Sequence, residues 1–346
     1  MRSWIIAPLL LVAAIAPGKA DPVGFAARTV PSPERRADLD VGIWYPGAPG
    51  GTPAVIGATP IFEGVAARRD PPIVAGHFPL ILLAHGGLRA APNLTNWLAA
   101  DLAARGMIVA TVPPPRLAEG EAAAALRETW LRPLELSRIL TAVLKDAAFG
   151  PHVASDRIAV VGFLRGGTSA LALAGARFDP ARVQAFCETP IKGPAAEQDC
   201  GWFARHGVAP HAADPNQLAR DFRDPRIVIA IAIDPELADR FSRASLGEIA
   251  IPVSIINLGT VGAETSGLDG AALARLIPGA QFALVPRATP FSAFSLCAAG
   301  AGERLAAEGD AMAICQETAA ERSAMHQTIA DLIAHALARH TTAKAN

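Results

Sequence analysis

Aromatic side chains are scarce in this sequence: they make up 5% of the 346 residues, with a single tyrosine, Tyr45. Charge is sparse as well, because charged residues make up 18% of the chain and their formal sum is −1. A chain without a basic excess lacks the electrostatic footprint of a nucleic-acid or anionic-membrane binder, so we expect neither partner. The chain is instead 51% hydrophobic, enough for one large α/β domain with a sizeable core.

Cysteine is rare too, and its four copies show no C-x-x-C pattern and no neighbouring histidine, so we expect no metal site and no cofactor. Three pairings are possible in principle. The local one, Cys187–Cys200 with Cys297–Cys315, closes short loops at little entropic cost and is the expected one. Each bond would stabilise the fold by about 2–4 kcal/mol. Disulfides fit an exported protein, whereas four reduced, buried cysteines would fit a cytosolic one.

Long apolar runs are absent except at the N-terminus. Arg2 is followed by an apolar run from Trp4 to Ala16 and by small residues at Gly18 and Ala20. This pattern predicts a signal peptide over residues 1–20, with an uncleaved N-terminal anchor as the alternative. The run is too short to span a bilayer comfortably, and no later segment has the length and apolarity of a transmembrane helix. We therefore expect a periplasmic or secreted protein whose mature chain is one domain, residues 21–346.

Buried-strand patterns alternate with helical ones along the mature chain, which predicts an α/β fold with a mostly parallel central sheet covered by helices on both faces. Residues 21–37 have an irregular pattern, and residues 47–76 that of an irregular insertion, an extended loop or a loose hairpin. Helical periodicity predicts helices over 93–105, over 122–147 with a kink or break at Pro133, and over 317–339. Apolar runs predict strands over 39–46, 79–84, 107–112, 157–163, 227–233, 252–258 and 281–285.

The stretch from Arg157 to Ala174 has the order strand, glycine-punctuated turn, helix. This is the frame of the G-x-S-x-G nucleophile elbow, in which a serine is held on a sharp turn between a strand and a helix. Gly162 and Gly166 occupy the two glycine positions, but Leu164 occupies the serine position. An elbow residue sits in a strained backbone conformation, so we expect Leu164 either to have relaxed or to be held there at a cost of about 1–3 kcal/mol.

Other stretches carry a resemblance to a known family: Val41–Pro46, Pro79–Gly87 (PLILLAHGG), Trp97–Ala99, Arg105–Ala110 and Arg132-Pro133. With the elbow, they resemble the dienelactone hydrolase-like, platelet-activating-factor-acetylhydrolase-like branch of the α/β-hydrolases, in its secreted bacterial form. Cys187 and the C-terminal cysteine pair also sit where relatives carry them. The resemblance covers most of the mature chain and implies the α/β-hydrolase fold.

The same resemblance implies a Ser-His-acid triad, whose three positions are degenerate here. Leu164 replaces the serine. The family's P-x-A-x-H-F run corresponds to Pro286–Phe291, which places Pro290 at the histidine position. Val261 falls near the acid position, with Glu264 or Asp269 as possible replacements. We therefore expect no catalytic residue at these positions.

Several residues could in principle replace the triad, and each has a plainer interpretation. We expect Ser169 to be bonded within its helix, and Ser292 and Ser295 to be loop serines facing solvent or a turn. Asp234, at the end of a strand, could act as a relocated acid but more plainly caps a turn before Pro235. For the histidines, we expect His85 to shape the oxyanion loop, and His326 and His335 to face water or helix packing.

The leading hypothesis is thus a catalytically inactive α/β-hydrolase-like protein that binds a small ester or carboxylate at the carboxyl edges of its strands. There the backbone N–H of Arg165 would serve as an oxyanion-type donor. An active serine hydrolase of the dienelactone hydrolase or acetylhydrolase type, using a relocated nucleophile, is the alternative. A scaffold role with an unknown protein partner is a third possibility. The expected pocket walls are His85, Gly86, Gly87, Leu88, Leu164, Arg165 and Pro290.

Overall fold

A computed structural model describes residues 23–84, 86, 93–112, 122–185, 187–188, 194–260, 263–264, 269–289, 291–307 and 312–343. Within these ranges no helix has the length and apolarity needed to cross a membrane. The expected segment 1–20 lies outside the described residues, as do His85, Gly87, Leu88, Val261 and Pro290.

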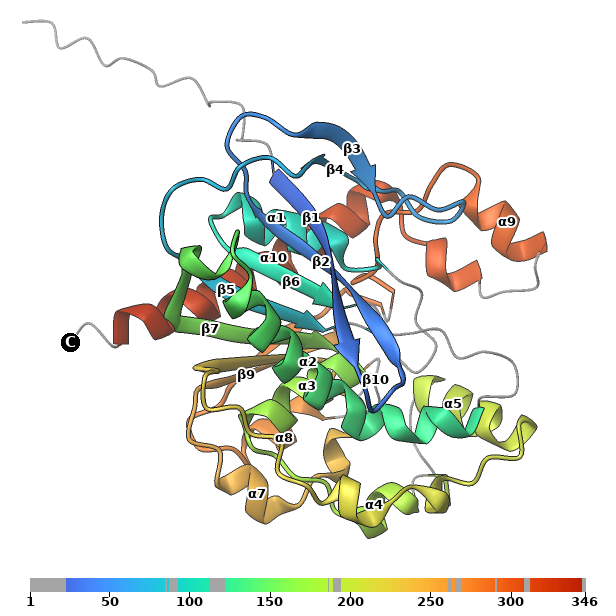
Figure 1. Ribbon diagram of the computed structural model, residues 1–346. Coiled ribbons are helices and arrows are strands. Elements are labelled where there is room, and N and C mark those ends of the chain that lie inside the picture. The colour runs from blue at the N-terminus through green and yellow to red at the C-terminus, as the bar shows by residue number, and fades with distance from the viewer. Residues whose placement is uncertain are drawn as a thin grey trace, which may run out of the picture.

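One twisted sheet runs through the molecule in the order β10-β9-β8-β7-β5-β6-β2-β1-β4-β3, with β11 paired to β9 (Figure 1). The pairs from β6 through β5, β7, β8 and β9 to β11 are all parallel, and β1 and β2 add an antiparallel edge. The strands are β1 (Val23–Ser32), β2 (Ala37–Pro46), β3 (Thr52–Ile56), β4 (Val65–Arg69), β5 (Phe78–Ala84), β6 (Ile108–Val112), β7 (Val153–Phe163), β8 (Ile229–Ile233), β9 (Val253–Thr260), β10 (Ala263–Glu264) and β11 (Gln281–Val285).

Helices fill most of the connections between these strands. The α-helices are α1 (Asn96–Ala104), α2 (Glu128–Lys145), α3 (Arg165–Ala174), α4 (Pro180–Gln184), α5 (Pro194–Arg205), α6 (Pro215–Leu218), α7 (Arg243–Gly247), α8 (Gly270–Ala274), α9 (Ala301–Ala307) and α10 (Ala319–Ala343). The 3₁₀ turns are η1 (Ala122–Arg127), η2 (Gly150–His152), η3 (Pro210–Ala212), η4 (Ala238–Arg240) and η5 (Met312–Cys315).

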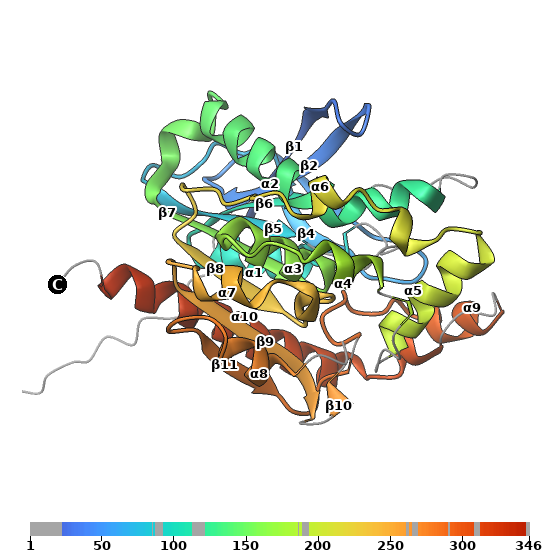
Figure 2. The same ribbon diagram turned by 90° about the horizontal axis from the view of Figure 1, so that it is seen from below.

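The sheet is covered on both faces, as the sequence predicts (Figure 2). Alternate side chains of each strand enter opposite layers of the core because successive residues point to opposite faces. Leu80 and Leu82 of β5 pack with helices α2 and α3, whereas Ile81 and Leu83 pack with α1 and α10. The apolar runs of the central strands are therefore those of strands buried on both faces.

The N-terminal part of the mature chain differs from the expectation of irregular structure. Residues 23–32 form β1, which pairs with β2 over its whole length, from Val23 opposite Pro46 to Ser32 opposite Ala37. The prolines and arginines in this segment obscured the strand pattern, yet Arg28 reaches out to Asp146 while Val30 is buried. Because β1 lies near the sheet edge, Pro31 is tolerated there.

Residues 47–76 contain a hairpin, β3 and β4, which is one of the alternatives expected for this segment. The turn between its strands docks on the C-terminal part of the chain: Phe62 forms a bridge with Cys297, and the Ala298 N–H donates to the Ile61 carbonyl at 2.9 Å. The long helical pattern over 122–147, in contrast, is divided differently than expected. The change from 3₁₀ to α-helix falls at Glu128, and α2 then continues through Pro133.

Both disulfides have the expected local pairing. Cys187 is bonded to Cys200, and Cys297 is bonded to Cys315. The first joins a small apolar cluster with Ala125 and Phe203. The second closes a loop between β11 and α10.

Candidate functional site

Leu164 occupies the apex of a sharp turn between β7 and α3, and it keeps the strained conformation of an elbow residue. Its backbone angles are φ 52° and ψ −123°, a conformation that residues other than glycine rarely adopt. The Leu164 N–H donates to the Ile233 carbonyl at 2.9 Å, and its carbonyl accepts from the Thr168 N–H at 3.1 Å. Leu164 has therefore not relaxed into an ordinary helical conformation; the surrounding structure holds it at the apex.

The flanking glycines are what allow this turn to close. A Cβ on Gly162 would lie 2.1 Å from the Gly166 carbonyl oxygen, and one on Gly166 would lie 2.2 Å from that of Ala84. No side chain fits at such distances, so β7, β5 and the first turn of α3 can meet only with glycine at both positions. The backbone geometry of the elbow thus requires both glycines, whether or not a nucleophile stands between them.

Because Leu164 is strained, we expect glycine to be more stable than alanine at this position, the reverse of their usual order. Leu164→Ala and Leu164→Gly lose the same packing beyond Cβ, but glycine adopts this conformation at no steric cost. We expect Leu164→Gly to be more stable than Leu164→Ala by about 1 kcal/mol in urea denaturation. At the exposed helical position Arg304, glycine should instead be the less stable of the pair. Greater stability of the alanine variant at position 164 would show that the turn is unstrained.

Arg165, next along the chain, has a buried side chain that faces an ionic neighbour. Its guanidinium Nε lies 3.4 Å from a Glu236 carboxylate oxygen, and the two side chains are 6% and 11% exposed. Thr168 donates its hydroxyl to the Glu236 carbonyl, which ties the same segment to α3. Beside Arg165 lies a cavity of about 20 Å³, walled by residues that include Leu126 and Phe203. That space holds one water-sized group.

Gly86, which follows β5, is hydrogen-bonded to α2. The Arg132 guanidinium donates to the Gly86 carbonyl at 2.8 Å and pairs with Glu128 at 3.0 Å. Arg35 reaches the other oxygen of Glu128. Burial alone would raise the pKa of Glu128, but Arg132 and Arg35 keep it below its ordinary value. Gly86, one of the expected pocket residues, is therefore held by an ionised, buried network that sequence reasoning missed, although Glu128 and Arg132 have helical i, i+4 spacing.

The described carboxylates that could replace the acid are already hydrogen-bonded to other groups of the protein. Asp234 is 1% exposed and accepts from the Asn257 side chain at 2.9 Å and from the Leu258 N–H at 3.0 Å. It therefore ties the end of β8 to β9, which corrects its assignment as a turn cap before Pro235. Asp269 is exposed and caps α8 by accepting from the Ala272 N–H at 2.8 Å. The side chain of Glu264 lies outside the described residues.

One carboxylate binds two residues that flank Pro290 in the sequence, Thr289 and Ser292. Glu317 accepts from the Thr289 hydroxyl at 2.9 Å and from the Ser292 hydroxyl. Burial alone would raise the pKa of Glu317, but hydrogen bonds from Ser292, Arg322 and Thr289 hold it below its ordinary value. Ser292 is fully buried and accepts from the Thr289 N–H at 2.7 Å, so of the two expected settings, solvent or a turn, it has the turn. Its hydroxyl already donates a hydrogen bond to a carboxylate and is not accessible to an ester.

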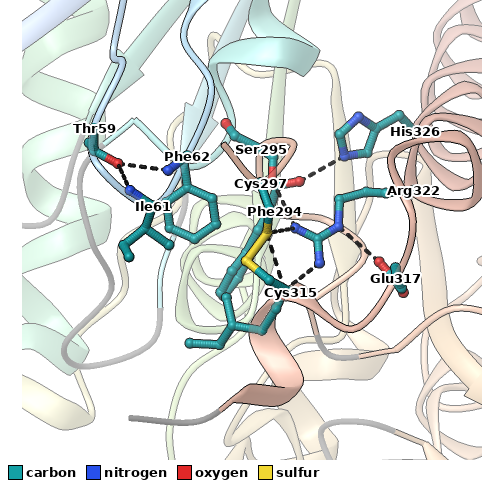
Figure 3. Close-up of a disulfide and its surroundings, with 11 residues drawn as sticks. Thr59, Ile61, Phe62, Phe294, Ser295, Cys297, Cys315, Glu317, Arg322 and His326 are labelled. Atoms are coloured by element: carbon teal, nitrogen blue, oxygen red, sulfur yellow. Dashed lines mark hydrogen bonds and ion pairs between the residues drawn. A yellow bond between two sulfur atoms is a disulfide. The ribbon is translucent and has the colours of Figure 1, made fainter. Parts of the chain in front are cut away.

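Arg322 connects that carboxylate to the second disulfide (Figure 3). Its side chain is 1% exposed and donates to Glu317 at 2.9 Å, to the Ser295 carbonyl at 2.9 Å and to the Cys297 sulfur at 3.2 Å. A further donor reaches the Ile314 carbonyl. Arg322 therefore holds together the loop that follows β11, the disulfide and the start of α10.

His326, one turn further along α10, is a packed side chain. Its ring stacks on Trp97 with centroids 3.6 Å apart, and its Nε2 donates to the Phe294 carbonyl at 2.8 Å. Because a carbonyl only accepts, Nε2 carries the proton. Burial lowers the pKa of His326 to about 4. His326 is neutral near pH 7 and serves the helix packing, whereas His335 is exposed.

The lowered pKa of His326 predicts an acid-sensitive stability. An unfolded histidine has an ordinary pKa near 6.5, so between pH 6.5 and 4 the unfolded chain binds the proton that the folded chain refuses. The free energy of unfolding should be fully retained above pH 6.5 and fall by up to about 3 kcal/mol as the pH drops toward 4. His326→Gln should flatten this slope, while His335→Gln should leave it unchanged. An identical slope in His326→Gln would assign the effect to other groups.

None of the other rescue candidates that the structure describes completes a triad. Ser169 donates to the Arg165 carbonyl at 2.9 Å, as expected for a hydroxyl bonded within its helix. Ser295 is buried and donates to the Leu94 carbonyl at 3.2 Å, so it faces neither solvent nor a turn, as had been expected, but a distant segment. Across the described part of the chain, no serine hydroxyl is hydrogen-bonded to a histidine. Of the expected pocket residues, the structure describes Gly86, Leu164 and Arg165.

Structural comparison places this architecture in a known class, the α/β-hydrolase fold. A ferulic acid esterase from Streptomyces cinnamoneus superposes with a TM-score of 0.59 at 16% identity, over 94% of this chain and 92% of that chain. A dienelactone hydrolase from Anabaena variabilis aligns at 12% identity over 89% and 96%, with a TM-score of 0.46. No protein-family model and no curated protein sequence matches the chain. The alignment with the ferulic acid esterase confirms, for the fold alone, the resemblance stated from the sequence.

Proposed function

We propose that this chain is an exported, non-hydrolytic protein with the α/β-hydrolase fold, which binds a small ester or carboxylate at the elbow. The observation that carries the proposal is Leu164 at the apex of an intact elbow. A leucine side chain cannot attack a carbonyl or be deprotonated, and removal of the nucleophile costs about 10⁴–10⁶ in turnover. The backbone N–H groups of the first turn of α3 remain donors for a carbonyl or carboxylate oxygen.

Two described serines that could have replaced the nucleophile support the same conclusion. Ser169 and Ser292 are 3% and 0% exposed, and each hydroxyl already donates to a group of the protein. A relocated nucleophile would need an accessible hydroxyl beside a base. Pro290 and Val261, at the histidine and acid positions, can supply neither an imidazole nor a carboxylate.

An ester assay combined with a covalent label tests the proposal. The mature protein is incubated with p-nitrophenyl butyrate and, separately, with a serine-directed phosphonate followed by mass spectrometry. We expect no turnover above a heat-denatured sample and no labelled serine. Turnover together with one stoichiometrically labelled serine would establish the alternative, an active serine hydrolase. Ligand-detected NMR with methyl butyrate tests binding, and absence of any signal at millimolar ester would contradict that part of the proposal.

Export is part of the proposal and rests on the two disulfides together with the apolar N-terminal run. The full-length chain should be recovered outside the cytoplasm with a new N-terminus near Asp21. N-terminal sequencing of the purified protein measures this. A protein that keeps Met1 and free thiols would contradict the exported, disulfide-bonded state.

A further inference from the structure

A second cavity lies at the amino ends of the central strands, opposite the carboxyl ends that carry the elbow. It has a volume of about 210 Å³ and lies between α10 and the amino ends of β5, β7 and β8, beside Met107 at the start of β6. Figure 1 shows the C-terminal part of α10 and the amino end of β7 on the same side of the molecule. Nothing in the elbow geometry involves this cavity, so an inference about it stands apart from the proposed function.

Short side chains on facing elements create the space. Closer to its start, α10 fills the interface with Ile329 and Ile333, both 0% exposed and packed on the sheet. Further along, the helix presents Ala334 toward the sheet, and β7 presents Ala159 as part of the same lining. The methyl groups of Ala334 and Ala159 cannot span the gap that Ile329 and Ile333 fill nearer the start of α10, so an apolar hollow remains.

The rim of this hollow carries a cation without a carboxylate partner. Arg157 lies two residues before Ala159 on β7 and so shares its face of the sheet. Its guanidinium donates to the His77 carbonyl at 3.1 Å. Among the described residues, no carboxylate lies within ion-pairing distance of Arg157, and Asp156, the other charge in the lining, is exposed to solvent. The remaining donors of the guanidinium suit a planar carboxylate.

We infer that this cavity is a binding site for a small monocarboxylate with an apolar body of about one ring. An apolar cavity of about 150 Å³ in another protein takes up benzene, so a single ring fits the volume available here. The ring would rest on Ala159, Ile229 and Leu337, with the carboxylate at Arg157. The pairing of an apolar floor with one cationic rim residue selects an amphipathic anion over a neutral or cationic compound of the same shape.

Methyl NMR of the intact mature protein tests this inference, with benzoate as the probe. The full sequence has four methionines, and Met107 lines the cavity, so a ¹³C-methyl label reports on the site with few signals. Met107→Leu assigns its resonance. We expect a saturable shift of the Met107 methyl with benzoate and weaker binding of the uncharged analogue benzyl alcohol.

Charge and space are then tested separately. Arg157→Gln should weaken benzoate about tenfold and leave benzyl alcohol within about twofold, because a charge-assisted hydrogen bond is lost. Asp156→Asn should strengthen benzoate binding, since it removes the like charge at the rim. Ala334→Leu should abolish binding of both ligands by filling the cavity. A non-saturating Met107 shift, or benzoate affinity unchanged in Arg157→Gln and Asp156→Asn, would overturn the inference even if Ala334→Leu folds poorly.

Discussion

Replacing Arg322 by alanine should destabilise the fold by about 3–5 kcal/mol, the range found when one partner of a buried ion pair is removed. The guanidinium is 1% exposed and holds Glu317 and the Ser295 carbonyl, both at 2.9 Å. Its loss would leave the Glu317 carboxylate without its cation and the Ser295 carbonyl without this donor. The measurement is urea denaturation of the oxidised protein, followed by tryptophan fluorescence.

Arg177→Ala is the matched control for this prediction. Arg177 also pairs with a glutamate, Glu248, at 2.7 Å, but the two side chains are 30% and 53% exposed. Exposed pairs contribute about 0–1 kcal/mol, so this variant should lose no more than that. Equal losses for the two variants would mean that Arg322 is dispensable and that the disulfide alone organises the loop after β11.

The second large effect is expected for Gly166→Ala, at the elbow itself. The new Cβ would lie 2.2 Å from the Ala84 carbonyl oxygen and 2.6 Å from the Ala84 carbonyl carbon. Both are backbone atoms of the central strand β5, so relief requires moving β5 or α3. We expect a loss of about 3 kcal/mol in the free energy of unfolding, the upper part of the range for overpacked cores.

Gly302→Ala separates this steric effect from the ordinary helical preference for alanine. Gly302 is the second residue of α9, as Gly166 is of α3, but nothing lies within 4 Å of a Cβ placed on it. Alanine should therefore stabilise the protein there by about 0.5–1 kcal/mol. A Gly166→Ala variant that behaves like Gly302→Ala would show that the contact between the elbow and β5 is loose.

Much of the fold could be predicted from the sequence because its central strands are apolar on both faces. The runs at 79–84 and 157–163 have one structural solution, a buried parallel strand, and both appear as β5 and β7. The edge of the sheet lacks that signal. Residues 23–32 contain Arg28 and Pro31, and their strand character comes from pairing with β2. Beside β1 on the side away from β2, β4 pairs only with Gly24 and Phe25, so most of β1 has one partner strand and carries little hydrophobic pattern of its own.

The candidate site was predictable where backbone geometry dictates residue type, and obscure where it depends on tertiary contacts. The glycines at 162 and 166 predict the elbow, since no other residue fits at these positions. Nothing local indicates that Glu317 reaches back to Thr289 and Ser292, which lie 28 and 25 residues earlier. The sequence likewise predicts a turn residue at Asp234 and gives no sign of its hydrogen bonds to Asn257 and Leu258. Such partners are brought together only by the folded sheet.

The most direct test of the account is the rate of p-nitrophenyl butyrate hydrolysis in three matched proteins. These are the unaltered mature chain, Leu164→Ser alone, and Leu164→Ser combined with Pro290→His and Val261→Asp. We predict that the first two are inactive and that the triple variant hydrolyses the ester, because the strained elbow and its N–H donors persist. Hydrolysis by the unaltered chain, or a triple variant that folds but stays inactive, would contradict the claim that an intact elbow has lost only its reacting groups.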